Sequence, residues 1–400
     1  MNNNVLRLYE IANSPERIIV GLMSGTSLDG LDVALCKFSG AGMNTKIELL
    51  AFTIVPYDDD YKREIASVFS KREVDLEKIC LLNAWIGQLH GKMVNQCLKE
   101  WNQPLEKIDL IASHGQTIYH APKKLHKQVK FGNATLQLGD GDHLAVETGI
   151  ITVSDFRQKH IAAGGEGAPL AAYGDFLIFS KGGEERIMLN IGGIANFTYL
   201  PSDLQADKVF STDTGPGNTL MDAFVRLHFP GKYFDENAAL ATSGEINERL
   251  LNTLKDHPFF LQDFPKTTGP ELFNLLYLEG AMNRSGTLDL SVEDTMATLN
   301  RFSAETIAEA ILLVTRDKTE VVLYGSGGGI HNPLLMRNLA ELLPGHKFLN
   351  TDALHIQPDA KEAVLFAVLA NETICGNSLK FGGGKSSIPN ISMGKISFAS

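Results

Sequence analysis

Short apolar runs that end in glycine and small polar residues recur along the whole 400-residue chain. Three of them end in SGTSLDG at 24–30, DTGPGN at 213–218 and GSGGG at 325–329. Runs rich in Ile, Val and Leu favour strands, whereas Gly, Ser and Asp favour the tight turns that follow strands. Another apolar run, at 109–113, is expected to end before His114. Helical spacing of apolar residues lies between these runs, at about 219–227, 307–314, 333–342 and 359–375. Asn332 as cap and Pro333 as first residue are expected to start the helix at 333–342. Strands and helices in this arrangement predict a layered α/β fold.

The two halves of the chain open in the same way. Residues 18–38 and 187–200 each have the pattern of a strand, a glycine-containing turn and a second strand. This echo predicts duplicated domains, with a boundary near 171–186. We therefore expect domains at 1–178 and 179–400, with the final helix free to pack back on the first. The tail FGGGKSSIPN is expected to be a loop.

Composition excludes several functional classes. A hydrophobic content of 44% supports a large core, and 36 basic against 47 acidic side chains give a formal charge of −11. This charge argues against nucleic-acid and membrane partners, which attract basic surfaces. It leaves phosphate ligands open, because backbone N–H groups and Mg²⁺ can hold them. The absence of an apolar leader and of a disulfide or zinc spacing among the four cysteines predicts a cytoplasmic protein with free thiols.

The glycine loops do not match the common nucleotide motifs. Gly25 and Gly30 have P-loop spacing, but Leu31 and Asp32 follow where Lys and Ser/Thr belong. Taken together, the three loops still suit a phosphate clamp at strand ends. In the first, Asp29 has the chemistry to hold Mg²⁺ through water. The second adds a carboxylate and a helix N-terminus, and the third leaves bare backbone for adenine or ribose.

Four further side chains are candidates for chemistry. Asp155 follows a predicted strand and suits a general base, with a structural ion pair or helix cap as the alternative. Arg157 suits a bidentate contact with an acidic group, or a structural salt bridge. His114 suits a bond to a substrate hydroxyl, or a packing role. Glu362 lies three residues after Asp359, which is also the pattern of a helix capping box.

The sequence resembles the anhydro-N-acetylmuramic acid kinase family through six motifs that appear in order between about residues 18 and 371. These are GLMSGTSLDGLDVAL, SHGQTIYH, SDFRQKHIAAGGEGAPL, LNIGGIANFTYL, DTGPGNTLMD and YGSGGGIHNPLL. The resemblance implies two ribonuclease-H-like domains of the actin/hexokinase/heat-shock-chaperone type flanking a nucleotide cleft, with ATP and Mg²⁺ as cofactors. It implies phosphorylation of 1,6-anhydro-N-acetylmuramic acid on O6 with hydrolysis of the anhydro bridge, in cell-wall recycling.

The resemblance also assigns roles residue by residue. It implies that Asp155 is the base and that Glu362 faces the sugar. It also implies that three loops contact the nucleotide, at Gly25, Thr26, Ser27, Asp29, Asp213, Gly215, Gly217, Gly327, Gly328 and Gly329. The sugar contacts of His114 and Arg157 and the Mg²⁺ contact of Asp29 are expected from the residues themselves.

The chain departs from the family pattern at three places. His160 stands where the family has Asp, Pro270 stands where it has Arg, and the stretch after Leu170 differs. Asp175 is a candidate to compensate for the change at 160. These departures leave open a related sugar kinase with another substrate, and a chaperone-like ATPase or silent nucleotide-binding module stays as the rival class. A small amino sugar is the expected partner, and a homodimer stays open.

Overall fold

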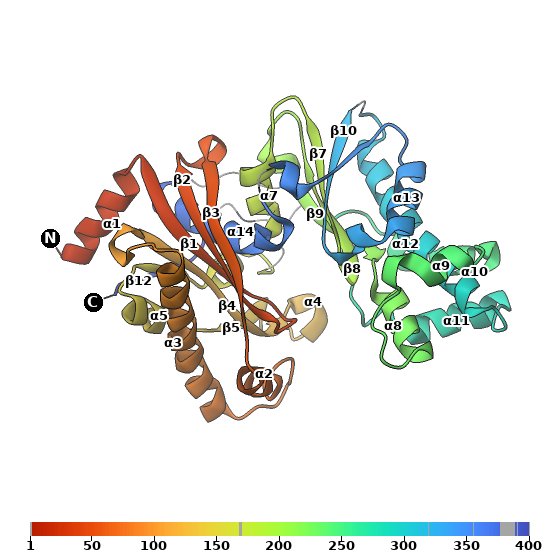
Figure 1. Cartoon of the computed structure of the whole chain (residues 1–400), viewed down its shortest axis with the longest axis horizontal. Helices are drawn as coiled ribbons and strands as arrows, with labels where there is room; N and C mark the ends of the chain where they lie inside the picture. The colour runs from red at the N-terminus through yellow and green to blue at the C-terminus, as the bar shows by residue number, and fades with distance from the viewer. Residues whose placement is uncertain are drawn as a thin grey trace. The chain divides into compact units, whose positions relative to one another are not determined.

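The computed structural model describes residues 2–167, 170–318, 320–354, 356–376, 389 and 391–399 (Figure 1). It divides into two compact units. The first unit is Met1–Phe179 together with His355–Ser400, and the second is Ser180–Leu354. The first unit therefore takes back the end of the chain, which the expected 179–400 domain included. Nearly all of the expected loop at 381–390 lies outside the described residues.

The first unit is built on a mixed sheet in the order β12-β6-β4-β1-β2-β3, with β5 paired to β4. Strands β1, β2 and β3 are antiparallel neighbours, whereas β4 and β6 run parallel to β1. The strands are β1 (Glu16–Ser24), β2 (Gly30–Ser39), β3 (Lys46–Pro56), β4 (Leu110–Ala121), β5 (Ala134–Leu138), β6 (Thr152–Ser154) and β12 (Lys395–Ser397). The helices are α1 (Asn3–Asn13), α2 (Asp59–Ala66), α3 (Leu76–Glu100), α4 (Lys123–His126), α5 (Gly141–Thr148), α6 (Phe156–Ala162), α7 (Ala171–Phe179) and α14 (Lys361–Cys375).

The second unit repeats this topology. Its sheet has the order β11-β10-β7-β8-β9, with β7, β8 and β9 antiparallel and with β10 and β11 parallel to β7. The strands are β7 (Glu185–Ile191), β8 (Ile194–Leu200), β9 (Phe210–Pro216), β10 (Val321–Ser326) and β11 (Lys347–Asn350). Three antiparallel strands followed by two parallel ones, in the order 3-2-1-4-5, define the ribonuclease-H-like sheet. The predicted α/β class is confirmed, and so is the hairpin at the start of each half.

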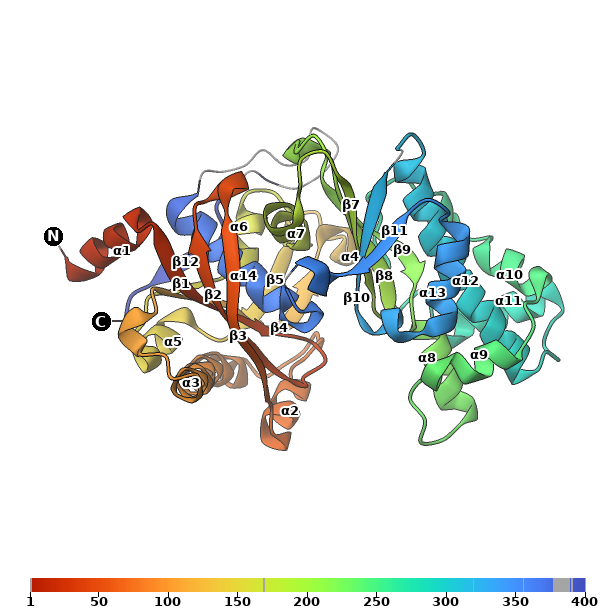
Figure 2. The same ribbon diagram turned by 45° about the horizontal axis from the view of Figure 1, so that its top comes forward.

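Helix α14 covers one face of the first sheet, and α3 covers the other (Figure 2). Val20 and Leu22 of β1 belong to one core cluster with Leu82 and Ile86 of α3. Gly21 lies between them in sequence and therefore points to the opposite face. A Cβ at this position would lie 2.0 Å from the carbonyl oxygen of Ala363 in α14. Glycine is thus required for the close approach of α14.

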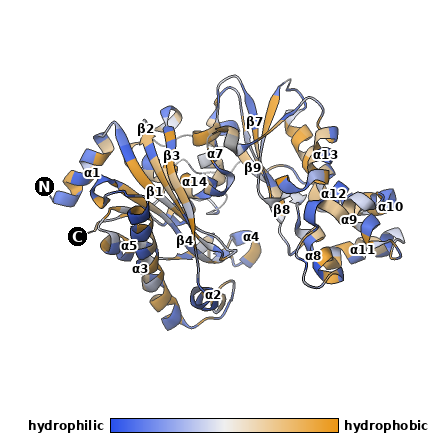
Figure 3. Cartoon of the chain, viewed as in Figure 1, coloured by the Kyte–Doolittle hydropathy of each residue, from blue (hydrophilic) through white to orange (hydrophobic). Residues whose placement is uncertain are grey.

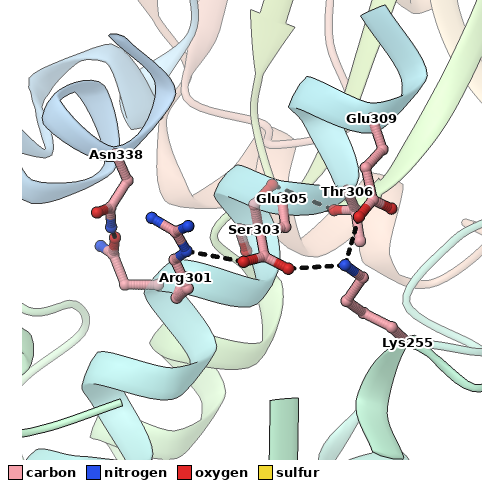
Figure 4. A network of polar contacts seen from close by, with 8 residues as sticks. Lys255, Arg301, Ser303, Glu305, Thr306, Glu309 and Asn338 are labelled. Atoms are coloured by element: carbon pink, nitrogen blue, oxygen red, sulfur yellow. Dashed lines mark hydrogen bonds and ion pairs between the residues drawn. The ribbon is translucent and has the colours of Figure 1, made fainter. Parts of the chain in front are cut away.

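The second unit carries a layer of helices beside its sheet: α8 (Thr219–His228), α9 (Ala239–Ser243), α10 (Glu248–Lys255), α11 (Leu275–Ser285), α12 (Val292–Thr315) and α13 (Pro333–Leu342). Polar contacts tie α12 to its neighbours (Figure 4). Lys255 pairs with Glu305 at 2.7 Å and also with Glu309, and Arg301 donates to Glu305 at 2.8 Å. These links fix α12, which packs against β8 and β9.

Hydropathy follows this layering. Strands β1 to β4 carry hydrophobic stretches, whereas helices such as α1 and α3 mix hydrophobic and hydrophilic residues (Figure 3). Such mixed helices bury one stripe and expose the other. Among the helices formed by the described residues, none combines the length and apolar character needed to cross a bilayer.

Two sequence-based boundaries are wrong. The run from residue 109 was expected to end before His114, but β4 continues to Ala121. The run from residue 209 was expected to end before Asp213, but β9 continues to Pro216. In both cases pairing with neighbouring strands extends through polar residues that local propensity assigns to turns.

We expect Gly21→Ala to reduce the free energy of unfolding by about 1–3 kcal/mol, because the added methyl group overpacks against α14. Gly132→Ala is the matched control, since a Cβ there meets nothing within 4 Å. Calorimetric unfolding of both variants checks this. Equal transition temperatures for the two variants would contradict the packing argument.

Candidate functional site

A cavity of about 430 Å³ lies in the first unit at the end of β1. The turn after β1, the middle of β4, strand β5, helix α6 and the start of α14 all contribute to it. Its lining residues are Met23, Ser24, Gly25, Thr26, Ser27, His114, Thr117, His120, Thr135, Gln137, Arg157 and Glu362. The structure thus brings together six residues that the sequence analysis proposed, from segments up to 337 positions apart: Gly25, Thr26, Ser27, His114, Arg157 and Glu362.

The lining residues that sequence reasoning missed lie mainly on two strands. Thr135 and Gln137 are two positions apart on β5 and therefore point to one face of the sheet. Thr117 and His120 come from the part of β4 that lies beyond the expected end of this strand, and neither was given a role in the site. The period of two along β5 is the signal that would have found the first pair.

His114 and Arg157 form a fixed pair in the cavity. The Arg157 Nε–H donates to His114 Nε2 at 2.7 Å, and its Nη1 donates to the Gly167 carbonyl at 2.7 Å. His114 therefore accepts at Nε2 and carries its proton on Nδ1. Burial first, and then the Arg157 charge, lower the pKa of His114 well below its usual value. The histidine is therefore neutral at physiological pH, and the guanidinium is held in one orientation.

Glu362 provides the carboxylate of the cavity. Although its side chain is accessible to solvent, it lies deep among the surrounding elements, and this desolvation raises its pKa, against the opposing charges of Arg157 and Lys361. Helix α14 begins after Ala360, and no side chain caps its N-terminus. The capping-box interpretation of Asp359 and Glu362 is therefore wrong.

Asp155 lies apart from this cavity. It precedes α6 with a φ of 56°, makes no side-chain cap, and is absent from the cavity lining. Its Oδ2 is 2.7 Å from Nζ of Lys395, on the strand that pairs with β6. An ion pair with lysine holds this carboxylate, so its role as the base stays a prediction.

The departures from the family pattern have local explanations. His160 accepts the Gly167 N–H at Nδ1 over 2.9 Å, and burial lowers its pKa to about 4. A neutral acceptor at this position makes a backbone bond that an aspartate can also make. Asp175 is paired with Lys361 at 2.9 Å, which is a separate contact from that of His160.

Pro270 belongs to a segment that contacts the second glycine loop. Thr268, two residues earlier, donates its N–H to Asp213 Oδ2 at 2.8 Å, and the Asp213 N–H donates to the Lys266 carbonyl at 3.0 Å. The change at 270 therefore lies near the Asp213 carboxylate rather than in the 430 Å³ cavity.

The second unit has its own cavity of about 340 Å³. Its lining residues are Asn218, Met221, Asp222, Phe234, Asp235, Asn237, Gly328, His331 and Asn332. The start of α8 and the GSGGG loop therefore meet here. Sequence reasoning missed Asp222, although it lies four residues after Asn218 on one face of α8. Burial raises the pKa of Asp222 to about 6.

The remaining loop glycines pack closely against protein atoms, and their contacts with the nucleotide stay a prediction. A Cβ on Gly217 would lie 2.3 Å from the Gly192 carbonyl, and Ser303 of α12 donates to the Gly217 carbonyl at 2.8 Å. Gly215, Gly327 and Gly329 likewise face protein atoms and are absent from the lining of both cavities. Only Gly328 of the third loop faces the 340 Å³ cavity.

The turn after β1 concentrates negative charge. Ser27 Oγ donates to Asp29 Oδ1 at 2.6 Å, and Asp29 is exposed. Burial, followed by the charges of Glu362, Asp29 and Asp359, raises the pKa of Asp32 to about 7. Within the described ranges, no group of three or more Asp, Glu, His or Cys side chains could hold a metal by itself. A cation that takes one carboxylate and completes its shell with phosphate and water still fits, as Mg²⁺ does.

Comparisons with known proteins give the family. The family model described as anhydro-N-acetylmuramic acid kinase matches residues 17–393. A protein named anhydro-N-acetylmuramic acid kinase from Pseudoalteromonas atlantica is 58% identical over 399 residues, covering 100% of both chains. A protein of the same name from Caldanaerobacter subterraneus is 38% identical, covering 98% of this chain and 99% of the relative. The six motifs, the two sheets of similar topology and this full-length similarity agree, and the chain belongs to the anhydro-N-acetylmuramic acid kinase family.

Proposed function

We propose that the chain transfers the γ-phosphoryl group of ATP to O6 of 1,6-anhydro-N-acetylmuramic acid while water opens the 1,6-anhydro bridge. The products are N-acetylmuramic acid 6-phosphate and ADP. Membership of the family supports a kinase role in recycling this amino sugar. The observation that carries the proposal is the cavity in which the β1 turn, a fixed arginine and a carboxylate meet.

The sugar is placed in the 430 Å³ cavity. Arg157 is the cation on the wall, and it suits the acidic side arm of a muramic acid. Neutral His114 and the polar side chains of β4 and β5 suit the hydroxyl and amide groups. The pairing of Arg157 with His114 pre-orients both before the sugar arrives, which lowers the ordering cost of binding.

In this proposal, Glu362 takes the proton of the attacking water. The water oxygen bonds to C1, the C1–O6 bond breaks, and O6 takes the phosphoryl group as ADP leaves. A carboxylate whose pKa is raised accepts a proton more readily than an ordinary one. Asp155 is less suited, because it is paired with Lys395 and does not line the cavity.

We assign the phosphates of ATP to the turn that follows β1. Asp29 is the residue that would hold Mg²⁺, through water. When bound, this ion neutralises the charge of the transferring phosphoryl group. The turn GTSLDG contains neither lysine nor arginine, so backbone N–H groups are its own means of holding an anion.

The reaction itself is tested with ATP, Mg²⁺ and the anhydro sugar in H₂¹⁸O. We expect the 6-phosphate to appear by mass spectrometry with one ¹⁸O at C1, because water attacks there. A product without the label would contradict hydrolysis of the bridge. Free amino sugars and unfolded peptide, added in parallel, test the other sugar kinases and the chaperone-like class.

We expect Glu362→Gln to lower kcat by roughly 10²–10⁴-fold, the usual contribution of a general base. Asp155→Asn should lower it less than about tenfold, because its carboxylate already forms an ion pair. Coupled measurement of ADP release gives both values. Glu372→Gln is the matched control on α14, since Glu372 accepts from Gly42 and does not line the cavity. A larger loss in Asp155→Asn than in Glu362→Gln would return the base to Asp155.

The raised pKa of Asp32 predicts a pH-dependent stability. The folded chain keeps a proton on Asp32 up to about pH 7, whereas the unfolded chain releases it near 3.8. The stability that the protonated Asp32 contributes to the folded chain is therefore fully present below the unfolded pKa and is lost as the pH rises through about 7. As the pH rises from 5 to 8, Asp32→Asn should become more stable relative to the natural chain, because the asparagine has no proton to lose. Thermal unfolding at each pH measures this difference. A constant difference across this range would contradict the shift.

Mg²⁺ should reduce that difference at pH 8 by offsetting the negative charge around Asp32. The effect should disappear in Asp29→Asn and persist in Asp59→Asn, a control in the first turn of α2. Equal Mg²⁺ effects in both variants would argue against Asp29 as the metal-holding residue.

A further inference from the structure

A chain of buried polar side chains lies behind the turn that follows β1. His90 Nε2 is 3.0 Å from the Tyr57 hydroxyl, which is 2.7 Å from Ser24 Oγ. Ser24 Oγ is 2.6 Å from Gln116 Oε1, and the Tyr61 hydroxyl is 3.1 Å from the same oxygen. The members come from α3, the residue after β3, α2, β1 and β4, and all are at most 3% exposed. None of them is used in the chemistry proposed above.

The direction of every bond in this chain follows from counting protons. Gln116 Oε1 can only accept, so the single proton of Ser24 points to it. Ser24 Oγ must then accept from the Tyr57 hydroxyl, whose oxygen must accept from His90 Nε2–H. Burial lowers the pKa of His90 to about 3, so the ring is neutral, with its proton on Nε2. His90 Nδ1 has no hydrogen-bond partner among the described residues.

The far end of the chain reaches the backbone of the turn. With its oxygen occupied by two hydroxyl groups, the Gln116 amide presents Nε2–H to the carbonyls of Gly25 and Thr117, each at 3.3 Å. In a trans peptide the carbonyl and the following N–H point in opposite directions. Anchoring the Gly25 carbonyl at Gln116 therefore turns the Thr26 N–H away from the buried amide. Gly25 and Thr26 both line the cavity.

We propose that His90 is a positioning residue for the β1 turn: by donating to Tyr57 it sets the polarity of the whole chain and holds the Gly25 carbonyl inward. The Thr26 N–H is then ready for a phosphate oxygen before ATP binds. This inference rests on the proposed function, because it presumes that the turn binds the phosphates of ATP. A merely structural network would stabilise the fold without affecting the nucleotide.

Substitutions at the His90 end of this hydrogen-bond chain separate the positioning role from a merely structural one. His90→Leu removes the donor, and Tyr57→Phe breaks the next link. His90→Gln keeps an N–H near the position of Nε2 and serves as the conservative rescue. Leu82→Ala is the matched control, since Leu82 shares the core cluster of this face but no polar contact.

Steady-state kinetics with ATP and sugar varied separately is the readout. We expect His90→Leu and Tyr57→Phe each to raise KM for ATP roughly fivefold to tenfold, about the effect of one hydrogen bond. KM for the sugar should change less than about twofold. The double variant should be no worse than either single one, because both break one chain. His90→Gln should restore most of the affinity for ATP.

Calorimetric titration of ADP into each variant keeps the two proposals distinguishable. If the natural chain binds ADP but forms no phosphorylated sugar, the proposed function fails while the titrations still test His90. If the natural chain turns over and His90→Leu matches Leu82→Ala in KM and in ADP affinity, the inference on His90 is overturned. Should His90→Leu not fold, Tyr57→Phe with its lost hydroxyl decides the same question.

Discussion

The close approach of α14 to β1 is the contact on which the first unit depends. The end of the chain returns to the strand that starts its fold, and Gly21 lets the two backbones meet at Ala363. The residue before this contact is Glu362, so the same packing that completes the sheet brings the carboxylate to the cavity. Phe366, one turn further along α14, lies 4.7 Å from the His114 ring between centroids. Packing and site geometry are thus set by one helix.

Electrostatics in the cavity follow from that packing. Arg157 and Glu362 bring opposite charges to a partly desolvated wall, and each charge shifts the pKa of the other group in the direction that favours ionisation. Burial works against this for the carboxylate and leaves its pKa raised. The neutral His114 between backbone and guanidinium adds no charge. The cavity therefore presents one cation and one carboxylate whose pKa stays raised, as the proposed binding of an acidic sugar requires.

Short sequence patterns predicted the features that depend on neighbouring residues, such as helix caps and hairpins. Asn332 caps α13 and Pro333 begins it, as expected, because the Asn332 side chain accepts the Leu335 N–H. The two predicted hairpins indicated two similar sheets. Glu362 shows where such patterns fail. Its spacing from Asp359 fits a capping box, but a 3-10 turn at Pro358–Ala360 precedes α14. Ala360 is therefore the N-cap residue, and no side chain caps the helix.

Contacts between distant segments explain the rest of what sequence could not give. Lys395 pairs with Asp155 across 240 positions, and nothing near Asp155 in the sequence indicates this. The continuation of β4 through His114 depends in the same way on β5 as a pairing partner. Motifs located the segments that carry the site. They did not tell which side chain of each segment faces the cavity and which is held by a partner from elsewhere.

The acidic balance of the chain bears on the turn that follows β1, where we propose that the phosphates bind. A lysine beside Asp29 and Asp32 would pair with these two carboxylates. A turn that binds through N–H groups avoids this, but backbone dipoles act only when they are oriented in advance. The neutral chain behind the turn supplies that orientation without adding charge. Because each of its hydroxyl groups has one proton, fixing one end fixes every bond as far as the Gly25 carbonyl.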